Sequence, residues 1–449
     1  MKQRNYHIDM SGNNLIQNIF LFSIPLMFTT LLQMLFNAAD TIVVGKFSGE
    51  TALAAVGATG SVTFLMIAFF NGLAVGTNVV VSKYIGAKDD LKTSEAVHTS
   101  MWISVVASIL MTVIGVSCSK VLLQLMSTPS NIIDLSTLYI RIIFSGSAFT
   151  LIYDFGTAIL RSSGDTKRPM YYLAVSGVIN VILNLFFVIV CNMSVAGVAL
   201  ATIISQAIAA ILTVITLMHE TNATKLYISK LKYNASFAKE IMLIGIPAGI
   251  NGIVFSFSNV VIQSSINSFN SNSIIAGNAA ALNLENFVYI GMDSFNKATA
   301  TFTAANVGAK NYQQIKKVLW LTMILTLVSG FLVSLIIYFN GNTFLGFYTN
   351  ESDVIYYGMY RLAFVTAWLP IQGISDTFIG SLRGMGFSTL PTIMMLVGIC
   401  GVRLVWLFTI FPMFHTLEIL YLCFSISWIV TDIIQGVLWI KSYRKFINE

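Results

Sequence analysis

The sequence contains few charged residues for its length. Only 10% of its 449 residues are Asp, Glu, Lys or Arg, whereas an ordinary soluble domain carries about 25%. Hydrophobic residues make up 56%, and the mean hydropathy is +0.79. This composition excludes a water-soluble protein. Because a membrane span needs about 20 apolar residues, the chain has room for about a dozen spans but not for a soluble catalytic domain.

The sequence also lacks the motifs of common enzyme classes. Its four cysteines are scattered without a CxxC pair, and its four histidines are isolated. It has no HExxH or Cys/His cluster for a metal, no GxSxG for a hydrolase and no Walker motif for ATP. We therefore expect a protein that is not an enzyme and has no cofactor or resident metal.

Long apolar runs are what the sequence has instead. Breaking them at charged residues and at Gly, Pro and Asn clusters predicts an all-α polytopic membrane protein with twelve transmembrane helices. The predicted ranges are 15–44, 51–82, 93–118, 133–160, 168–191, 194–219, 237–265, 273–306, 315–339, 354–382, 389–411 and 415–440.

Basic residues are divided unevenly between the two predicted faces of the membrane. An even number of spans puts both termini on one side, and nineteen Lys and Arg residues lie in the termini and loops of that side. The opposite loops contain only Lys46 and Lys120. Because cytoplasmic loops carry an excess of Lys and Arg, both termini are predicted to be cytoplasmic. The net charge of +6 then reflects topology, and no nucleic-acid partner is expected.

An internal repeat relates the two halves of the chain. Ile24-Pro25 recurs as Ile246-Pro247, and Gly86-Ala87-Lys88 recurs as Gly308-Ala309-Lys310, both at an offset of 222 residues. Six spans in each half give parallel repeats, which predict two pseudo-symmetric six-helix lobes.

The repeat divides the chain into three predicted segments. These are an N-lobe over 1–218, a cytoplasmic linker over 219–236 and a C-lobe over 237–449. Matched lobes of this kind bind substrate at their interface in transporters, and they imply alternating access. A duplicated receptor or scaffold is the alternative, although such proteins seldom need two matched halves.

The first predicted helix carries an acidic residue in an apolar run. Gln33, Asn37 and Asp40 lie at i, i+4 and i+7, so they share one face. An ionisable group inside a bilayer is costly and is retained mainly where it faces a cavity. Asp40 is therefore a candidate coupling site for H⁺ or Na⁺. The alternative is that Asp40 lies at the extracellular end of its helix and only faces water.

Polar side chains on the fifth and sixth helices are candidates for the same site. Asn180 and Asn184 lie one turn apart, and Thr202 lies on the next helix. Amides and hydroxyls supply oxygen ligands for Na⁺ or hydrogen bonds for a carboxyl group. Ordinary hydrogen bonding between helices explains these residues equally well.

The eighth helix has a polar face of its own. Asn278, Glu285, Tyr289 and Asp293 fall on one narrow stripe, which indicates a second surface for a cation or a cationic substrate. Lys297 lies one turn beyond Asp293 and is placed to pair with it.

The two halves have diverged in their chemistry. The offset places Ile262 where the first half has Asp40, whereas Asn37 recurs as Asn259. We therefore expect different acidic sites in the two halves. Gln33, Asn37 and Asn259 are candidate substrate-binding residues.

An Asp-x6-Arg pattern occurs once in each half. Asp154 precedes Arg161, and Asp376 precedes Arg383, near the cytoplasmic ends of the fourth and tenth helices. The spacing puts both groups on the same helical side, two turns apart. We interpret these four residues as structural ion networks near a cytoplasmic gate, with a coupling role as the alternative.

In combination, these motifs give a sequence that resembles the multidrug and toxic compound extrusion (MATE) family of bacterial cation-coupled exporters. The resemblance runs over essentially the whole chain and includes IPLMFTTLLQMLFNAADTIVVGKFSGETALAAVG, the GAK after helix two, LRSSGDTKRPM and LRGMGFSTLP. It implies that Asp40, Asn180, Asn184 and Thr202 form the cation or proton site. One subgroup of the family has an aspartate where Asn184 stands, so the choice between H⁺ and Na⁺ stays open.

The expected function is secondary active multidrug efflux. We expect amphipathic, often cationic, small molecules to be exported in exchange for H⁺ or Na⁺ by a monomer in the lipid bilayer of the bacterial cytoplasmic membrane. A lipid-linked sugar flippase of the same superfamily would need a more cationic lining than Arg141, Lys297, Arg361 and Arg403 provide. Arg141 and Arg403 are expected to have carboxylate or carbonyl partners. A membrane sensor without transport activity is the remaining alternative.

Overall fold

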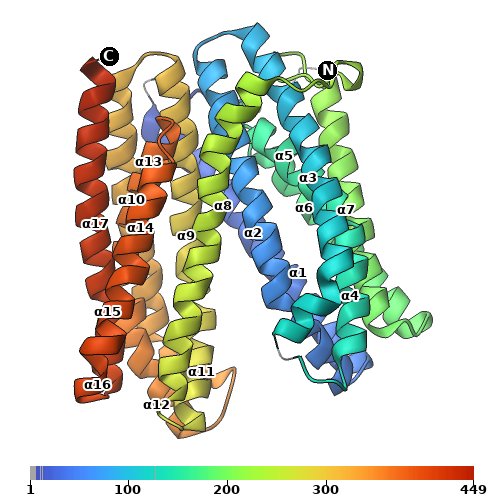
Figure 1. Ribbon diagram of the computed structural model, residues 1–449, viewed down its shortest axis with the longest axis vertical. Coiled ribbons are helices and arrows are strands. Elements are labelled where there is room, and N and C mark those ends of the chain that lie inside the picture. Colours follow the sequence, from blue (N-terminus) through green and yellow to red (C-terminus); the bar gives the residue numbers. More distant parts are fainter. Residues whose placement is uncertain (1–6, 11, 13, 127, 449) are drawn as a thin grey trace. The chain divides into compact units, whose positions relative to one another are not determined.

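The computed structural model describes residues 7–10, 12, 14–126 and 128–448, without the side chains of 255–257 and 448. Helices and their connecting loops account for all of these residues, and none lies in a strand (Figure 1). The all-α prediction is therefore confirmed for the part of the chain that the structure describes.

The described residues of the first half form seven α-helices. They are α1 (Leu15–Phe47), α2 (Glu50–Gly86), α3 (Asp90–Leu125), α4 (Ile133–Ser145), α5 (Ser147–Ser162), α6 (Lys167–Leu185) and α7 (Ser194–His219). A π-helical turn, η1 (Phe186–Val190), extends α6, and a short 3-10 turn, η2 (Ile228–Lys230), lies between α7 and the second half.

The second half repeats this order with more breaks. Its helices are α8 (Ala235–Asn267), α9 (Asn272–Gly308), α10 (Tyr312–Phe339), α11 (Gly341–Gly346), α12 (Ser352–Arg361), α13 (Leu369–Gly384), α14 (Thr389–Met395), α15 (Val402–Thr409), α16 (Phe411–Phe414) and α17 (Leu417–Asn448). The π-helical turns η3 (Leu362–Thr366) and η4 (Leu396–Gly401) join α12 to α13 and α14 to α15.

The described helices are consistent with the predicted number of spans. Ten are long and apolar enough to cross a membrane, and α4 with α5, bent by 45°, makes eleven if the pair is one span. The remaining long helix is α9, which has 37 residues and carries the charged residues Glu285, Asp293 and Lys297. The twelfth predicted span therefore corresponds to the most polar of the long helices.

Backbone conformation repeats along with the sequence. Lys88 and its counterpart Lys310 have φ angles of 55° and 56°, and Gly164 and its counterpart Gly386 have φ angles of 85° and 91°. Positive φ is uncommon outside glycine, so these pairs mark equivalent turns in the two halves.

Two compact units divide the chain inside α1 and α8. The first unit contains the chain up to Asp9 together with Ile24–Gly249, and the second contains Met10–Ser23 together with Ile250–Glu449. The predicted segments instead end at 218 and begin again at 237. The difference arises because the start of each half's first helix belongs to the other half's unit.

A close helix crossing explains why Ala235–Gly249 belongs to the first unit. Gly72 and Gly76 of α2 face Gly245 and Gly249 of α8, and a Cβ atom built on Gly72 would lie 2.2 Å from the backbone nitrogen of Gly249. Small residues spaced by four let two helix backbones approach this closely. The crossing thus depends on glycine in both helices.

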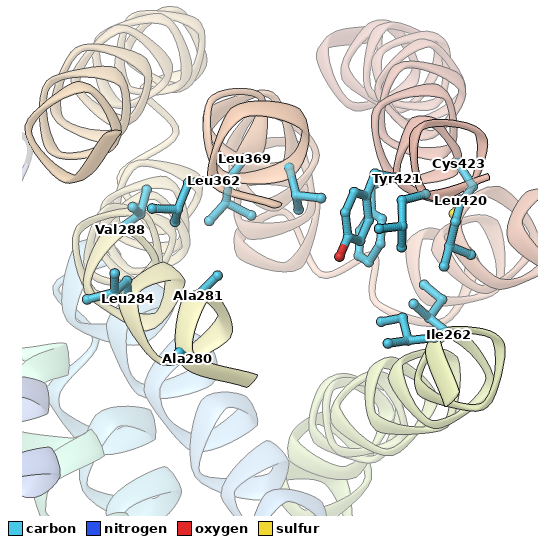
Figure 2. Packing of buried hydrophobic residues seen from close by; sticks show 14 of the residues in the cluster. Ile262, Ala280, Ala281, Leu284, Val288, Leu362, Leu369, Leu420, Tyr421 and Cys423 are labelled. Carbon is cyan, nitrogen blue, oxygen red and sulfur yellow. The ribbon is translucent and has the colours of Figure 1, made fainter. Parts of the chain in front are cut away.

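The core of the second unit lies between α8, α9, α13 and α17. Figure 2 shows Ala281, Leu284 and Val288 of α9 near Leu362 and Leu369, with Tyr421 of α17 beyond them. Leu362 and Ala281 are completely buried. This apolar packing surrounds the polar side chains that α9 and α12 bring inside.

Candidate functional site

Asp40 lies in a hydrogen-bonded cluster within the first unit. Asn184 of α6 donates a hydrogen bond from Nδ2 to Asp40 Oδ1, and the hydroxyl of Thr202 on α7 donates to Asp40 Oδ2 at 3.4 Å. Asn184 Nδ2 also donates to Asn180 Oδ1 at 3.2 Å, and Asn180 Nδ2 donates to Thr202 Oγ1 at 3.5 Å. Three helices therefore bring together the four residues that the sequence singled out.

One acceptor in this cluster has no partner. The side-chain oxygen of Asn184 makes no hydrogen bond, although the residue is completely buried. Leaving a buried polar atom unpaired is costly, and native structures seldom do so without a reason. A proton on Asp40, a water molecule or a cation would each supply the missing contact.

The Asp40 carboxylate contacts one amide nitrogen and one hydroxyl, and the cluster also contains two amide oxygens. The carboxylate, the two amide oxygens and the Thr202 hydroxyl are the kind of ligands that hard monovalent cations bind. Tyr139 of α4 interacts electrostatically with Asp40. No salt bridge within 4.0 Å joins Asp40 to a basic residue among those described. Asp40 therefore has no basic counter-ion among the described residues.

Gln33 and Asn37 share the helix of Asp40 but not its contacts. Both side chains are exposed, whereas Asp40 is half-buried. No hydrogen bond described for the chain joins their side chains to Asp40. Helical spacing thus correctly placed the three residues on one face of α1. The burial of this face, however, increases towards Asp40.

Glu285 and Asn278, both on α9, contact a buried arginine in the second unit. Arg361 donates from Nε and Nη2 to the two carboxylate oxygens of Glu285, each at 2.8 Å, and from Nη1 to Asn278 Oδ1. Thr366 donates to Glu285 at 3.1 Å. The sequence did not pair Arg361 with Glu285, since helical spacing does not show which neighbouring helix supplies a partner.

The polar face of α9 is divided between two sets of contacts. Asp293 accepts a hydrogen bond from Lys297 at 2.5 Å, as the spacing predicted. Tyr289, between the two sets, is exposed. Asn259 is half-buried on α8. The stripe seen in the sequence is therefore not one continuous surface.

The partners of Arg403 and Arg141 differ from the expectation. Arg403 donates to the hydroxyls of Ser427 at 3.1 Å and Ser258 at 3.0 Å, and Arg141 donates to the hydroxyl of Ser119 at 3.1 Å. Carboxylate or carbonyl partners were expected, so that prediction is wrong for these contacts. A guanidinium has five N–H donors. Serine hydroxyl oxygens can accept hydrogen bonds from them without adding a second charged group.

The Asp-x6-Arg residues are placed differently in the two units. Asp376 and Arg383 are buried, but no ion pair within 4.0 Å joins them among the described contacts, and Asp376 Oδ2 and Arg383 Nε lack hydrogen bonds. Asp154 and Arg161 are half-buried. Asp432 of α17, which no pattern in the sequence indicated, accepts a hydrogen bond from Ser375.

A second cluster, which the sequence did not indicate, holds His7 against the loop before α6. His7 contacts the backbone oxygen of Ser163 at 3.1 Å and the carboxylate of Glu220 at 3.5 Å. Arg168 bridges Glu220 and the fully buried Asp165. His7 is isolated in the sequence, so no local pattern could have indicated these partners.

This cluster should make docking of the N-terminal segment depend on pH. The hydrogen bond to Glu220, opposed by burial, raises the pKa of His7 above its ordinary value. Burial raises the pKa of Glu220, but His7 and Arg168 outweigh it and lower that pKa overall. The contribution of His7 is fully present below about pH 6.5 and is lost as the pH rises through its raised pKa.

Hydrogen exchange of residues 7–10 tests this expectation. Exchange should be slower at about pH 5.5 than at about pH 8, after correction for the intrinsic rate. His7→Gln should remove the difference, whereas His219→Gln, at an exposed histidine, should preserve it. Equal corrected protection of the wild-type segment at both pH values would contradict the assignment.

Within the described residues, no group of three or more His, Cys, Asp or Glu side chains is placed to hold a metal ion. The chain matches the family model MatE twice, over residues 25–186 and 247–409. The starts of the two matches are 222 residues apart, which is the offset of the internal repeat.

Known proteins resemble the chain over most of its length. It is 27% identical over 395 residues to the probable multidrug resistance protein YoeA of Bacillus subtilis, covering 86% of this chain and 85% of the relative. It is 25% identical over 393 residues to the probable multidrug resistance protein NorM of Thermotoga maritima, covering 85% and 82%.

The fold also matches solved structures. An outward-facing multidrug resistance MATE family transporter of the MOP superfamily gives a TM-score of 0.90 at 18% identity, with 100% of both chains covered. A MOP superfamily transporter from Pyrococcus furiosus gives 0.92 at 19% identity, with 99% of both covered.

Proposed function

The chain belongs to the MatE (MATE) family, and from this premise we propose that it is a secondary active exporter of amphipathic, often cationic, compounds. Similarity to multidrug resistance proteins over 85% to 86% of this chain supports the substrate class. Exchange for H⁺ or Na⁺ is supported by one observation above all. Asp40 is half-buried, has no basic partner within 4.0 Å among the described residues and lies beside the unpaired oxygen of Asn184.

The proposed cycle uses Asp40 as the exchangeable charge. A cation or proton binds at Asp40, Asn180, Asn184 and Thr202, and its binding competes with the substrate. The protein with the bound cation or proton then changes to its inward-facing state. One elementary charge moving down about 100 mV supplies about 2.3 kcal/mol, which sustains a gradient of about fiftyfold for an uncharged substrate. Exchange of one monovalent cationic substrate for one ion moves no net charge, so it draws on the concentration gradient of the ion or on a second ion. One or two coupled ions therefore suffice for useful export.

Other polar residues have proposed roles outside this ion site. Gln33 and Asn37 are exposed on the helix of Asp40 and are assigned to the substrate path, together with Asn259, Tyr289 and Asp293. We assign a structural role near the cytoplasmic gate to Asp154, Arg161, Asp376 and Arg383. Glu285 and Asn278 contact Arg361, which favours the different role argued below.

Internal pairing of the basic residues favours the exporter over a lipid-linked sugar flippase. Arg361 pairs with Glu285, Lys297 pairs with Asp293, and Arg403 and Arg141 donate to serine hydroxyls. Cationic groups engaged in this way are poorly placed to bind a pyrophosphate. The excess of basic residues on one predicted face supports cytoplasmic termini, and we assign the chain to the bacterial cytoplasmic membrane as a monomer.

Dye transport in proteoliposomes tests the proposed function. Purified protein should move a fluorescent cationic dye against its gradient when either an H⁺ gradient or a Na⁺ gradient is imposed, and running the two separately identifies the ion. Liposomes without protein provide the control. Absence of transport under both gradients, with protein that remains monodisperse after reconstitution, would exclude the proposed activity.

A further inference from the structure

The two units have different residue types at the positions that the internal repeat relates. In the second unit, the positions that correspond to Asp40, Asn180 and Asn184 carry no acid or amide. These counterparts, at the 222-residue offset, are Ile262, Val402 and Trp406. α17 begins 223 residues after α7, so Thr202 corresponds to Ser425, which is next to Phe424. The second unit therefore cannot build the same cation site from the same positions.

Two buried arginines lie beside Phe424, close to these counterpart positions. The guanidinium carbon of Arg403 lies 4.4 Å from the centre of the Phe424 ring, and that of Arg361 lies 5.4 Å from it. A cation over an aromatic face is favoured by the ring quadrupole. Arg361 and Arg403 are only 3% and 2% exposed. Phe424, next to the counterpart of Thr202, thus lies beside two permanent cations.

The offset also relates Arg361 to the neighbourhood of Asp40. The counterpart of Arg361 in the first unit is Tyr139. The Tyr139 side chain interacts electrostatically with Asp40. The counterpart of Arg403 is Val181. The first unit has a carboxylate without a basic partner among the described residues, whereas the second has guanidinium groups close to the corresponding place.

Glu285 supplies the counter-charge for this arrangement. Its bidentate contact with Arg361 satisfies both carboxylate oxygens, and Thr366 adds a third hydrogen bond. The titratable groups that interact with this pair are Arg403 of α15 and Tyr421 and Cys423 of α17. An arginine side chain stays protonated in proteins, so its charge cannot leave as a coupling ion does.

We propose that Arg361 and Arg403 act as tethered cations that permanently fill the second unit's counterpart of the Asp40 site. Glu285 is then a fixed counter-ion, and this counterpart site takes up no exchangeable H⁺ or Na⁺. The inference rests on the proposed function for its meaning in the transport cycle. The charge of the Glu285 carboxyl group can be measured without any transport assay.

Infrared titration of purified protein tests the inference. Protonated carboxyl groups would be followed from about pH 5 to about pH 9 in the wild type, R361Q and E285Q/R361Q. The wild type and the double variant should titrate alike, because Arg361 engages both carboxylate oxygens of Glu285 in the wild type. R361Q should gain one titrating carboxyl that the double variant lacks. R141Q, at an arginine bonded to a serine hydroxyl in the first unit, should resemble the wild type.

Two results would overturn the inference. One is a titrating carboxyl in the wild type that disappears in E285Q/R361Q, and the other is no additional titration in folded R361Q. If R361Q does not fold, the wild type and the double variant still decide the question. Dye transport by E285Q/R361Q should keep the ion dependence of the wild type. Lack of transport by the wild type would contradict the proposed function and leave the infrared result valid.

Discussion

Replacing Asp40 with asparagine is expected to abolish gradient-driven export while leaving the folded protein in the membrane. Asparagine has the same shape and can still accept a hydrogen bond from Asn184 or Thr202, so the stability should change by only about 1 kcal/mol. It cannot bind a proton or hold a monovalent cation by charge. Export should therefore lose the free energy of the ion gradient, which amounts to about 2.3 kcal/mol for each net charge that moves down about 100 mV.

Drug resistance and dye transport provide the two measurements for Asp40→Asn. Cells that express the variant at the wild-type level should be as sensitive as cells without the protein, and proteoliposomes should show no dye movement under either ion gradient. Asp134→Asn is the matched control, because Asp134 lies in the same unit with 85% of its side chain exposed. It should leave transport unchanged.

Moving the carboxylate within the cluster sharpens this test. In Asp40→Asn/Asn184→Asp, the charge moves to a position whose side chain already hydrogen-bonds Asp40 and Asn180. The double variant should recover part of the ion-dependent transport if the negative charge is what matters. Wild-type resistance in Asp40→Asn at equal expression would exclude Asp40 as the coupling residue.

The repeat and the Asp40 cluster illustrate how much the sequence could predict. Helix lengths, turn residues at a constant offset and a rare acid in an apolar run are local signals, and they correctly indicated the all-α fold. The grouping of Asp40 with Asn180, Asn184 and Thr202 was implied by family resemblance. The hydrogen bonds between them then gave this grouping a geometry.

Contacts between distant helices account for what the sequence did not indicate. Arg361 and Glu285 are 76 residues apart, and His7 and Ser163 are 156 residues apart, so periodicity within one helix carries no information about either pair. Burial was also uneven along a single face of α1. Gln33 and Asn37 are exposed, whereas Asp40, on the same stripe, is half-buried against α6 and α7.

The division of α8 between the units also depends on a contact between distant helices. In this contact, glycines of α2 pack against glycines of α8. Gly72-x3-Gly76 and Gly245-x3-Gly249 are ordinary in an apolar sequence, and each matters only because the other packs against it. A Cβ atom on Gly76 would lie 2.3 Å from the backbone oxygen of Ile241. Backbone atoms cannot rotate away as a side chain can, so the contact tolerates no added methyl group.

Gly72→Ala is therefore expected to destabilise the first unit strongly. The new Cβ atom would lie 2.2 Å from Gly249 N and 2.6 Å from Gly245 O, so α2 and α8 must separate. Overpacking a tight contact costs about 1–3 kcal/mol and sometimes more, and here a backbone has to move. The thermal midpoint in detergent should fall clearly, and the yield of monodisperse protein should fall with it.

Gly57 and Gly60 provide matched controls for this prediction on the same helix. No atom lies within 4 Å of a Cβ built at either position. Gly57→Ala and Gly60→Ala should be neutral or stabilising by up to about 1 kcal/mol, because alanine favours helix more than glycine does. A thermal midpoint for Gly72→Ala equal to that of these controls would show that the two helices do not approach as closely as described. The predicted contrast follows from the crossing and not from glycine content, because the same substitution is made three times in α2 and only one copy meets a backbone.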